Sequence, residues 1–120
     1  MDKDVNIIDL KEKVKLFCEE RDWDQFHSPK DLAIGVITEA SELLELFRFK
    51  NLAEQKELFL NKDKKYEISL EVADIFFFLL RFSQMYNVDL SESLIKKMDI
   101  NTKRYSVEKS KGSNKKYSEL

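Results

Sequence analysis

The stretch IGVITEASELLELF, residues 34–47, organises the chain. Its apolar residues recur at three- and four-residue spacing, which is the pattern of an amphipathic helix. Its carboxylates, Glu39, Glu42 and Glu45, recur every three residues. Side chains three apart on a helix lie about 5–6 Å from one another at Cβ. Like charges that close repel, so these residues need either open water or a cation.

A second carboxylate pair, Glu71 and Asp74, has the same spacing and is followed directly by the apolar run IFFFLL. An ionised carboxylate in such a segment is unfavourable unless it is paired or bound to a metal. Two pairs on two helices supply the hard oxygen ligands that Mg²⁺ prefers. We therefore predict a Mg²⁺ site. Two alternatives stay open, a solvated acidic face at 39–45 and an ion pair of Asp74 with a cation such as Arg81.

The composition predicts an all-α protein, a four-to-five-helix bundle, because 120 residues include only two glycines and one proline. The net charge of −2 gives no basic field for a nucleic acid polymer. The single cysteine, Cys18, indicates a reducing compartment, and no apolar run is long enough to cross a membrane. We expect a soluble cytoplasmic protein.

Helices are expected over residues 5–21, 29–49 and 64–86, with a loop carrying a short helix at 51–62 and a last helix from about 90. Ser28 and Pro29 suit the N-cap and first position of the second helix. Asp89 and Glu92 suit a capping box. One domain is expected over 1–108 and a flexible polar tail over 109–120. The third helix is apolar on nearly every side at 72–82, more than a small monomer can cover, which predicts contact with another subunit.

Two further groups suit a nucleotide. Lys97, Asn101 and Arg104 share one stripe of the last helix, with Tyr105 beside them, which suits a polyphosphate or a plain solvated face. The connection at 23–27 holds Trp23, Phe26 and His27, which either stack on a base or form a satellite of the core. Since His27 is the only histidine, a diiron site with two Glu-x-x-His pairs is disfavoured.

These motifs together resemble the MazG-like superfamily of all-α nucleoside triphosphate pyrophosphohydrolases, and within it the dCTP pyrophosphatase branch. The similar stretches run through nearly the whole chain and are ERDWDQFHSP, EASELLELF, EVAD, VDL, KMDINTKRY and the closing KYSEL. The resemblance implies a Mg²⁺-dependent enzyme that releases a nucleoside monophosphate and pyrophosphate. It also implies a homotetramer, a dimer of dimers.

The resemblance implies roles for individual residues. The implied metal ligands are Glu39, Glu42, Glu71 and Asp74. Our own hypothesis for the mechanism adds that Glu42 or Glu45 orients the attacking water or takes its proton. The residues implied to contact substrate, together with candidates from the motifs above, are Trp23, His27, Phe49, Phe78, Lys97, Asn101, Arg104 and Tyr105.

The chain departs from the family pattern in the implied base pocket. The family histidine of the first helix is Val14 here, a tryptophan near the end of the second helix is Phe49, and a tyrosine after the motif aspartate is Phe78. Lost hydrogen-bonding groups change discrimination between bases. The alternative substrates to dCTP are therefore dUTP or another noncanonical nucleotide. A separate alternative to an enzyme is a non-catalytic helical interaction module.

Overall fold

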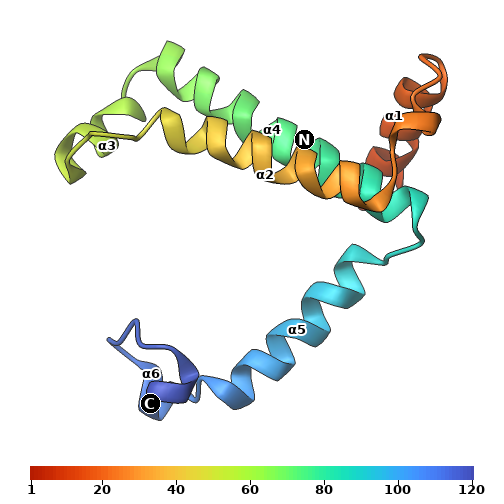
Figure 1. The fold of residues 1–120 in the computed structure, drawn as a ribbon. Helices are drawn as coiled ribbons and strands as arrows, with labels where there is room; N and C mark the ends of the chain where they lie inside the picture. Colours follow the sequence, from red (N-terminus) through yellow and green to blue (C-terminus); the bar gives the residue numbers. More distant parts are fainter. The chain divides into compact units, whose positions relative to one another are not determined.

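The computed structural model describes all 120 residues of the chain (Figure 1). The chain forms two compact units, Met1–Asn87 and Val88–Leu120. No strand is present, so the predicted all-α class is confirmed. The elements are α1 (Ile7–Glu19), η1 (Asp24–Phe26), α2 (Pro29–Glu45), α3 (Leu52–Leu58), α4 (Lys62–Met85), α5 (Leu90–Arg104), α6 (Val107–Ser110) and η2 (Tyr117–Glu119).

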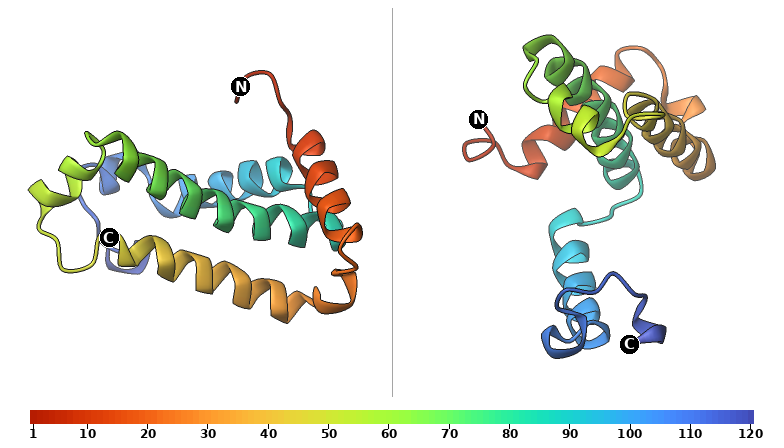
Figure 2. Two further views of the ribbon diagram at one scale, coloured as in Figure 1. Left: turned by 90° about the horizontal axis from the view of Figure 1, so that it is seen from above. Right: turned by 90° about the vertical axis from the view of Figure 1, so that its left-hand side faces the viewer.

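The first unit is built on a pair of long helices, α2 and α4, which lie side by side and run in opposite directions (Figures 1 and 2). The short helix α3 lies in the connection between them, and α1 packs against the C-terminal part of α4. The most buried apolar side chains are Cys18, Leu32, Ile68 and Leu80, one or two from each of α1, α2 and α4. The core therefore joins these three helices.

Local signals set the start of each helix in this unit. The Ser28 hydroxyl accepts a hydrogen bond from the Asp31 amide at 3.1 Å, and Pro29 is the first helical residue, as predicted. Asn51 caps α3 reciprocally with Glu54. The predicted short helix within 51–62 and the long helix that follows it are confirmed, with boundaries within two residues for the latter.

The end of α2 differs from the prediction. The helix ends at Glu45, not near residue 49. The amides of Phe47 and Arg48 both bond to the Leu44 carbonyl, and Phe49 follows with φ 63°. A left-handed residue cannot continue a right-handed helix, so the chain turns there.

A close approach between α2 and α4 depends on Gly35. A Cβ atom at this position would lie 2.6 Å from two ring carbons of Phe78 and 2.9 Å from its Cγ. Only a residue without a side chain lets the Phe78 ring lie against the α2 backbone.

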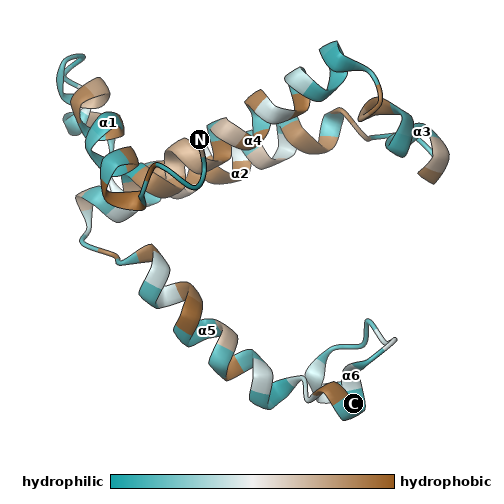
Figure 3. Cartoon of the chain, turned by 180° about the vertical axis from the view of Figure 1, so that it is seen from behind, coloured by the Kyte–Doolittle hydropathy of each residue, from teal (hydrophilic) through white to brown (hydrophobic).

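The apolar half of α4 is only partly buried within the chain. Its hydrophobic residues gather in the C-terminal part of the helix (Figure 3). Val72, Phe76 and Leu79 remain 38–49% exposed, so the chain alone does not cover this apolar surface, as the sequence indicated, and contact with another subunit stays a prediction. No helix combines the length and apolar character needed to cross a membrane.

The second unit consists of α5, α6 and η2. Asp89 caps α5 by accepting from the Glu92 amide at 2.8 Å, as predicted. The reciprocal half of the capping box is wrong, because the Glu92 carboxylate pairs with Lys96 at 2.6 Å instead. Helix α6 and the η2 turn lie partly within the stretch expected to be a flexible tail, and its mobility stays a prediction.

Candidate metal centre

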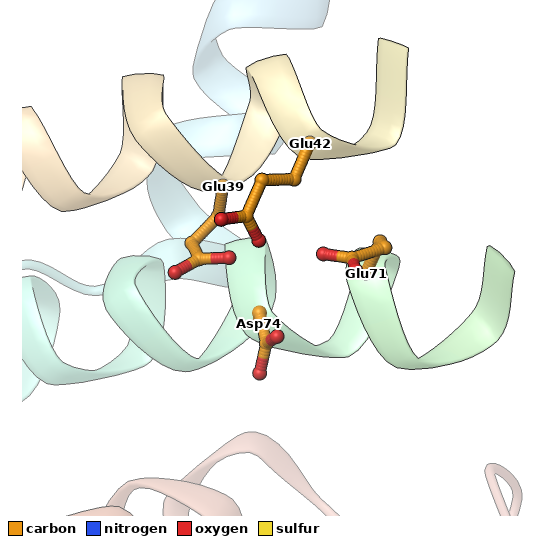
Figure 4. Close-up of side chains that lie close together, drawn as sticks. All are labelled: Glu39, Glu42, Glu71 and Asp74. Carbon is orange, nitrogen blue, oxygen red and sulfur yellow. The ribbon is translucent and has the colours of Figure 1, made fainter. Parts of the chain in front are cut away.

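The two carboxylate pairs converge between α2 and α4 (Figure 4). Glu39 and Glu42 project from α2, while Glu71 and Asp74 project from α4. One carboxylate oxygen from each residue lies within 4.8 Å of the other three. Opposite ligands of one divalent ion bound at 2.0–2.6 Å are roughly 4–5 Å apart, so this spread fits a cation site.

The same convergence raises the affinity of two of these carboxylates for protons. Burial, then a hydrogen bond with Glu42 and the charges of its neighbours, raise the pKa of Glu39 from 4.5 to about 7. Burial is also the largest cause that raises the pKa of Glu71, followed by a hydrogen bond with Glu42. The Glu42 carboxylate lies close to both groups, and its negative charge disfavours the ionised form of each.

Two oxygens of the cluster have no hydrogen-bond partner. The Oε2 atoms of Glu39 and Glu71 are buried and make no hydrogen bond. A buried acceptor without a donor is unfavourable, and a cation would satisfy both oxygens at once. The donor set, four hard oxygens, suits Mg²⁺ better than a soft metal. The residues present therefore fit a hard divalent cation.

Arg81 does not neutralise Asp74, so that alternative from the sequence is wrong. The Arg81 guanidinium is 1% exposed and faces the connection before α2. It pairs with Asp24 and donates from Nε to Nδ1 of His27 at 2.9 Å. It also donates from Nη1 to Gln84 at 2.6 Å. Its hydrogen-bonding capacity is directed away from the carboxylate cluster.

Glu45 lies outside the four-carboxylate cluster. Its Oε1 pairs with Arg48 at 3.0 Å. Three residues advance a helix by about 300°, so each step of three turns the side chain by about 60°. Glu45 is therefore about 120° round the helix from Glu39, and Glu42 lies between the two directions. The regular three-residue spacing in the sequence does not by itself show that Glu45 points away from Glu39.

Trp23 and His27 lie in a connection held at both ends, which we call the aromatic connection (residues 23–27). The amides of Trp23 and Asp22 bond to the carbonyls of Cys18 and Glu19, closing α1, and Asp22 is left-handed with φ 54°. The rings of Trp23 and His27 meet edge to face at 6.2 Å. The Trp23 ring also meets the Phe17 ring at 5.5 Å, and 37% of the residue's surface remains exposed and accessible to a ligand.

Phe49 and Phe78, the two substituted positions of the implied base pocket, differ in environment. Phe49 is 91% exposed, and the Arg48 guanidinium lies over its ring at 4.5 Å. A bulky residue with positive φ is strained. Phe78 is instead half-buried, packed on Gly35 and edge to face with Phe77. Phe78 thus serves the packing of the two helices, whatever else it contacts.

The remaining predicted residues belong to the second unit. Lys97, Asn101 and Arg104 lie on α5, and Tyr105 is its C-cap. The Arg104 guanidinium lies over the Tyr117 ring at 4.7 Å, and Tyr105 meets the same ring edge to face at 5.9 Å. Tyr117 was not predicted as a functional residue, because its contact with the end of α5 is invisible in the spacing of the sequence.

The sequence signature described as the MazG-like family matches residues 34–120, which include all four carboxylates and the whole of α5. The chain belongs to the MazG-like family. The resemblance seen in the motifs is therefore confirmed.

Three similar proteins indicate the branch of the MazG-like family to which this chain is related. It is 38% identical over 104 residues to dCTP pyrophosphatase 1 of Rattus norvegicus and 35% identical over 104 residues to that of Homo sapiens. The matches cover 87% of this chain but 61% of each relative, so the chain spans about 61% of their length. The crystal structure of a pyrophosphatase from Archaeoglobus fulgidus superimposes with a TM-score of 0.78 at 29% identity, covering 83% of this chain and 92% of that one. The chain is related to the dCTP pyrophosphatase branch of the family.

Proposed function

We propose that the chain is a Mg²⁺-dependent nucleoside triphosphate pyrophosphohydrolase. It cleaves between the α and β phosphates of a pyrimidine deoxynucleotide, foremost dCTP or a modified form of it. The observation that carries this proposal is the convergence of four carboxylates, two of them with buried oxygens that lack a partner. The names of the relatives, dCTP pyrophosphatase 1 and pyrophosphatase, support the reaction class.

Glu39, Glu42, Glu71 and Asp74 would hold the metal, which when bound offsets phosphate charge and acidifies water. The chain's own carboxylates then orient the attacking water and take its proton. Glu42 suits this role because its side chain is exposed and lies within the cluster. Glu45 is the second candidate, and its pairing with Arg48 leaves it anchored at the end of α2.

The remaining roles follow residue chemistry. We assign four aromatic side chains to the base, because aromatic rings stack on nucleobases. These residues are Trp23, His27, Phe49 and Phe78. We assign four polar side chains to the phosphates, because cations, an amide and a phenol can all donate hydrogen bonds to phosphate oxygens. These residues are Lys97, Asn101, Arg104 and Tyr105.

We also propose that the protein is a homotetramer, a dimer of dimers. Large apolar residues stay exposed along α2 and α4, among them Ile37 at 70%, Leu44 at 62% and Val72 at 49%. Exposed apolar patches of this kind mark interfaces. A monomeric mass by light scattering at micromolar concentration would contradict the proposal.

The function is tested with a panel of nucleoside triphosphates and Mg²⁺, by measuring release of both monophosphate and pyrophosphate. Glu42→Gln and Asp74→Asn each remove one ligand charge and should abolish turnover while the protein stays folded. The matched control is Glu57→Gln, an exposed carboxylate on α3 outside the cluster, which should retain full turnover. Release of orthophosphate instead of pyrophosphate, or wild-type turnover in both cluster variants, refutes the assignment.

A further inference from the structure

The aromatic connection is fixed by a buried cation from α4. Arg81 is the largest side chain with almost no exposed surface, at 1%. Its three nitrogens each have an acceptor, Asp24 and His27 on the connection and Gln84 on its own helix. Tyr86, the C-cap of α4, donates its hydroxyl to the His27 carbonyl at 2.6 Å. The end of α4 thus holds both the side chain and the backbone of His27.

The direction of the Arg81–His27 bond determines where the imidazole carries its proton. Arginine is only a donor, so the Nδ1 atom of His27, 2.9 Å from Arg81 Nε, must be an acceptor. A neutral imidazole with an unprotonated Nδ1 carries its proton on Nε2. Protonation of Nδ1 would place two donors and two positive charges against one another.

Burial and the charge of Arg81 also favour the neutral imidazole. Burial is the largest cause that lowers the pKa of His27, and the charge of Arg81 is the second. Asp24 in the connection and Asp31 on α2 act in the opposite direction and do not reverse the shift. His27 is therefore a neutral group held in one orientation.

We propose that Arg81 is a positioning residue: it fixes His27 as the Nε2–H tautomer and holds Trp23 and His27 in place for a bound ligand. His27 then offers one hydrogen-bond donor, Nε2–H, beside the partly exposed Trp23 ring. This pairing of an aromatic face with a single donor suits a planar ring that carries an acceptor on its edge. That the ring is a nucleobase rests on the function proposed above, whereas the role of Arg81 in fixing His27 does not.

The chain offers two unique reporters for this proposal. His27 is its only histidine and Trp23 its only tryptophan. Two-bond ¹H–¹⁵N correlation spectra of protein labelled at histidine therefore show one imidazole, and tryptophan fluorescence reports on one indole. We expect the wild-type spectrum at neutral pH to show a neutral imidazole with its proton on Nε2. An Nδ1–H tautomer or a charged ring would overturn the proposal without any variant.

The variant Arg81→Met keeps most of the side-chain volume and removes all the donors. We expect a mixed tautomer population for His27 and a shifted Trp23 emission, with unchanged helix content and an unchanged rise in melting temperature on adding Mg²⁺. Lys13→Met, which removes an exposed cation on α1, is the matched control and should leave both reporters as in the wild type. An Arg81→Met spectrum identical to the wild type would overturn the proposal.

Two further measurements separate the possible failures. If Arg81→Met does not fold, Asp24→Asn weakens the same network from a side chain that is 53% exposed, and a partial change at His27 is expected. No change at all in that variant counts against the proposal. In kinetics, Arg81→Met should raise KM for the nucleotide several-fold with kcat retained. If the wild type hydrolyses no nucleotide, the proposed function fails, while the tautomer measurement still decides the role of Arg81.

Discussion

Replacing Gly35 with alanine tests how closely α2 and α4 must approach one another. The new Cβ would lie 2.6 Å from Cδ1 and Cε1 of Phe78 and 2.9 Å from its Cγ. Cγ is attached directly to Cβ of Phe78, so the ring cannot escape by moving its far end alone. The two helix backbones must separate, or Phe78 must leave its rotamer.

The size of the effect follows from two opposing contributions. Overpacking a well-packed contact costs about 1–3 kcal/mol. Replacing a glycine inside a helix with alanine returns about 0.5–1 kcal/mol. We therefore expect Gly35→Ala to lower the free energy of unfolding by about 0.5–2 kcal/mol, the difference between these two contributions.

The substitution should also weaken the metal centre. Gly35 is one turn before Glu39, and Phe78 is one turn after Asp74, so the contact holds the two carboxylate pairs at their present separation. Wider spacing of the helices would separate the ligands, and Mg²⁺ tolerates departures from its geometry poorly. The rise in melting temperature on adding Mg²⁺ should be smaller in Gly35→Ala than in the wild type.

Urea unfolding of a double-mutant cycle measures the contact itself. In a Phe78→Ala background the clash is absent, so Gly35→Ala should be neutral or slightly stabilising. Thr38→Ala, at an exposed position of the same helix, is the control for helix propensity and should stabilise by a few tenths of a kcal/mol. If Gly35→Ala is as stable as the wild type while Phe78 is present, Phe78 does not lie as close to the α2 backbone as the structure places it.

Three further outcomes are expected. Because the pKa of Glu39 in the folded protein, about 7, lies above its ordinary value of 4.5, folding takes up a proton, and the metal-free protein should lose stability as pH rises from 5 to 8. In EDTA, Glu39→Gln should lose less stability than the wild type over this range, and equal slopes would contradict the expectation. Trp23→Ala should weaken nucleotide binding by about 1–3 kcal/mol, seen mainly in KM, while the affinity for pyrophosphate alone stays at the wild-type level. Ser28→Ala should lower the free energy of unfolding by about 1 kcal/mol in urea denaturation, because the Asp31 amide loses its acceptor, whereas Ser28→Asn, which keeps both an acceptor and a donor, should retain the cap.

Features that depend on neighbours in the sequence were predictable from the sequence. Ser28 and Pro29 start α2, and Asp89 caps α5, because caps involve residues only two or three positions apart. The pairing of Glu39 with Glu42, and of Glu71 with Asp74, is likewise a property of one helical turn. The end of α2 was predicted less well, because the left-handed turn at Phe49 has no glycine to announce it.

Features that join distant parts of the chain were decided only by the tertiary structure. The two carboxylate pairs share a site because Gly35 lets Phe78 bring α4 against α2, and no local pattern contains that distance. The sequence alone is equally compatible with an ion pair between Arg81 and Asp74, seven residues away on the same helix. It reaches instead across 54 and 57 residues to His27 and Asp24, because α1 and the connection pack against the end of α4. The sequence by itself determined the helices and the residue types that each carries, since hydrogen bonds within a helix are local. Which side chains meet was determined by how those helices pack, because burial and charge pairing depend on distances across the fold.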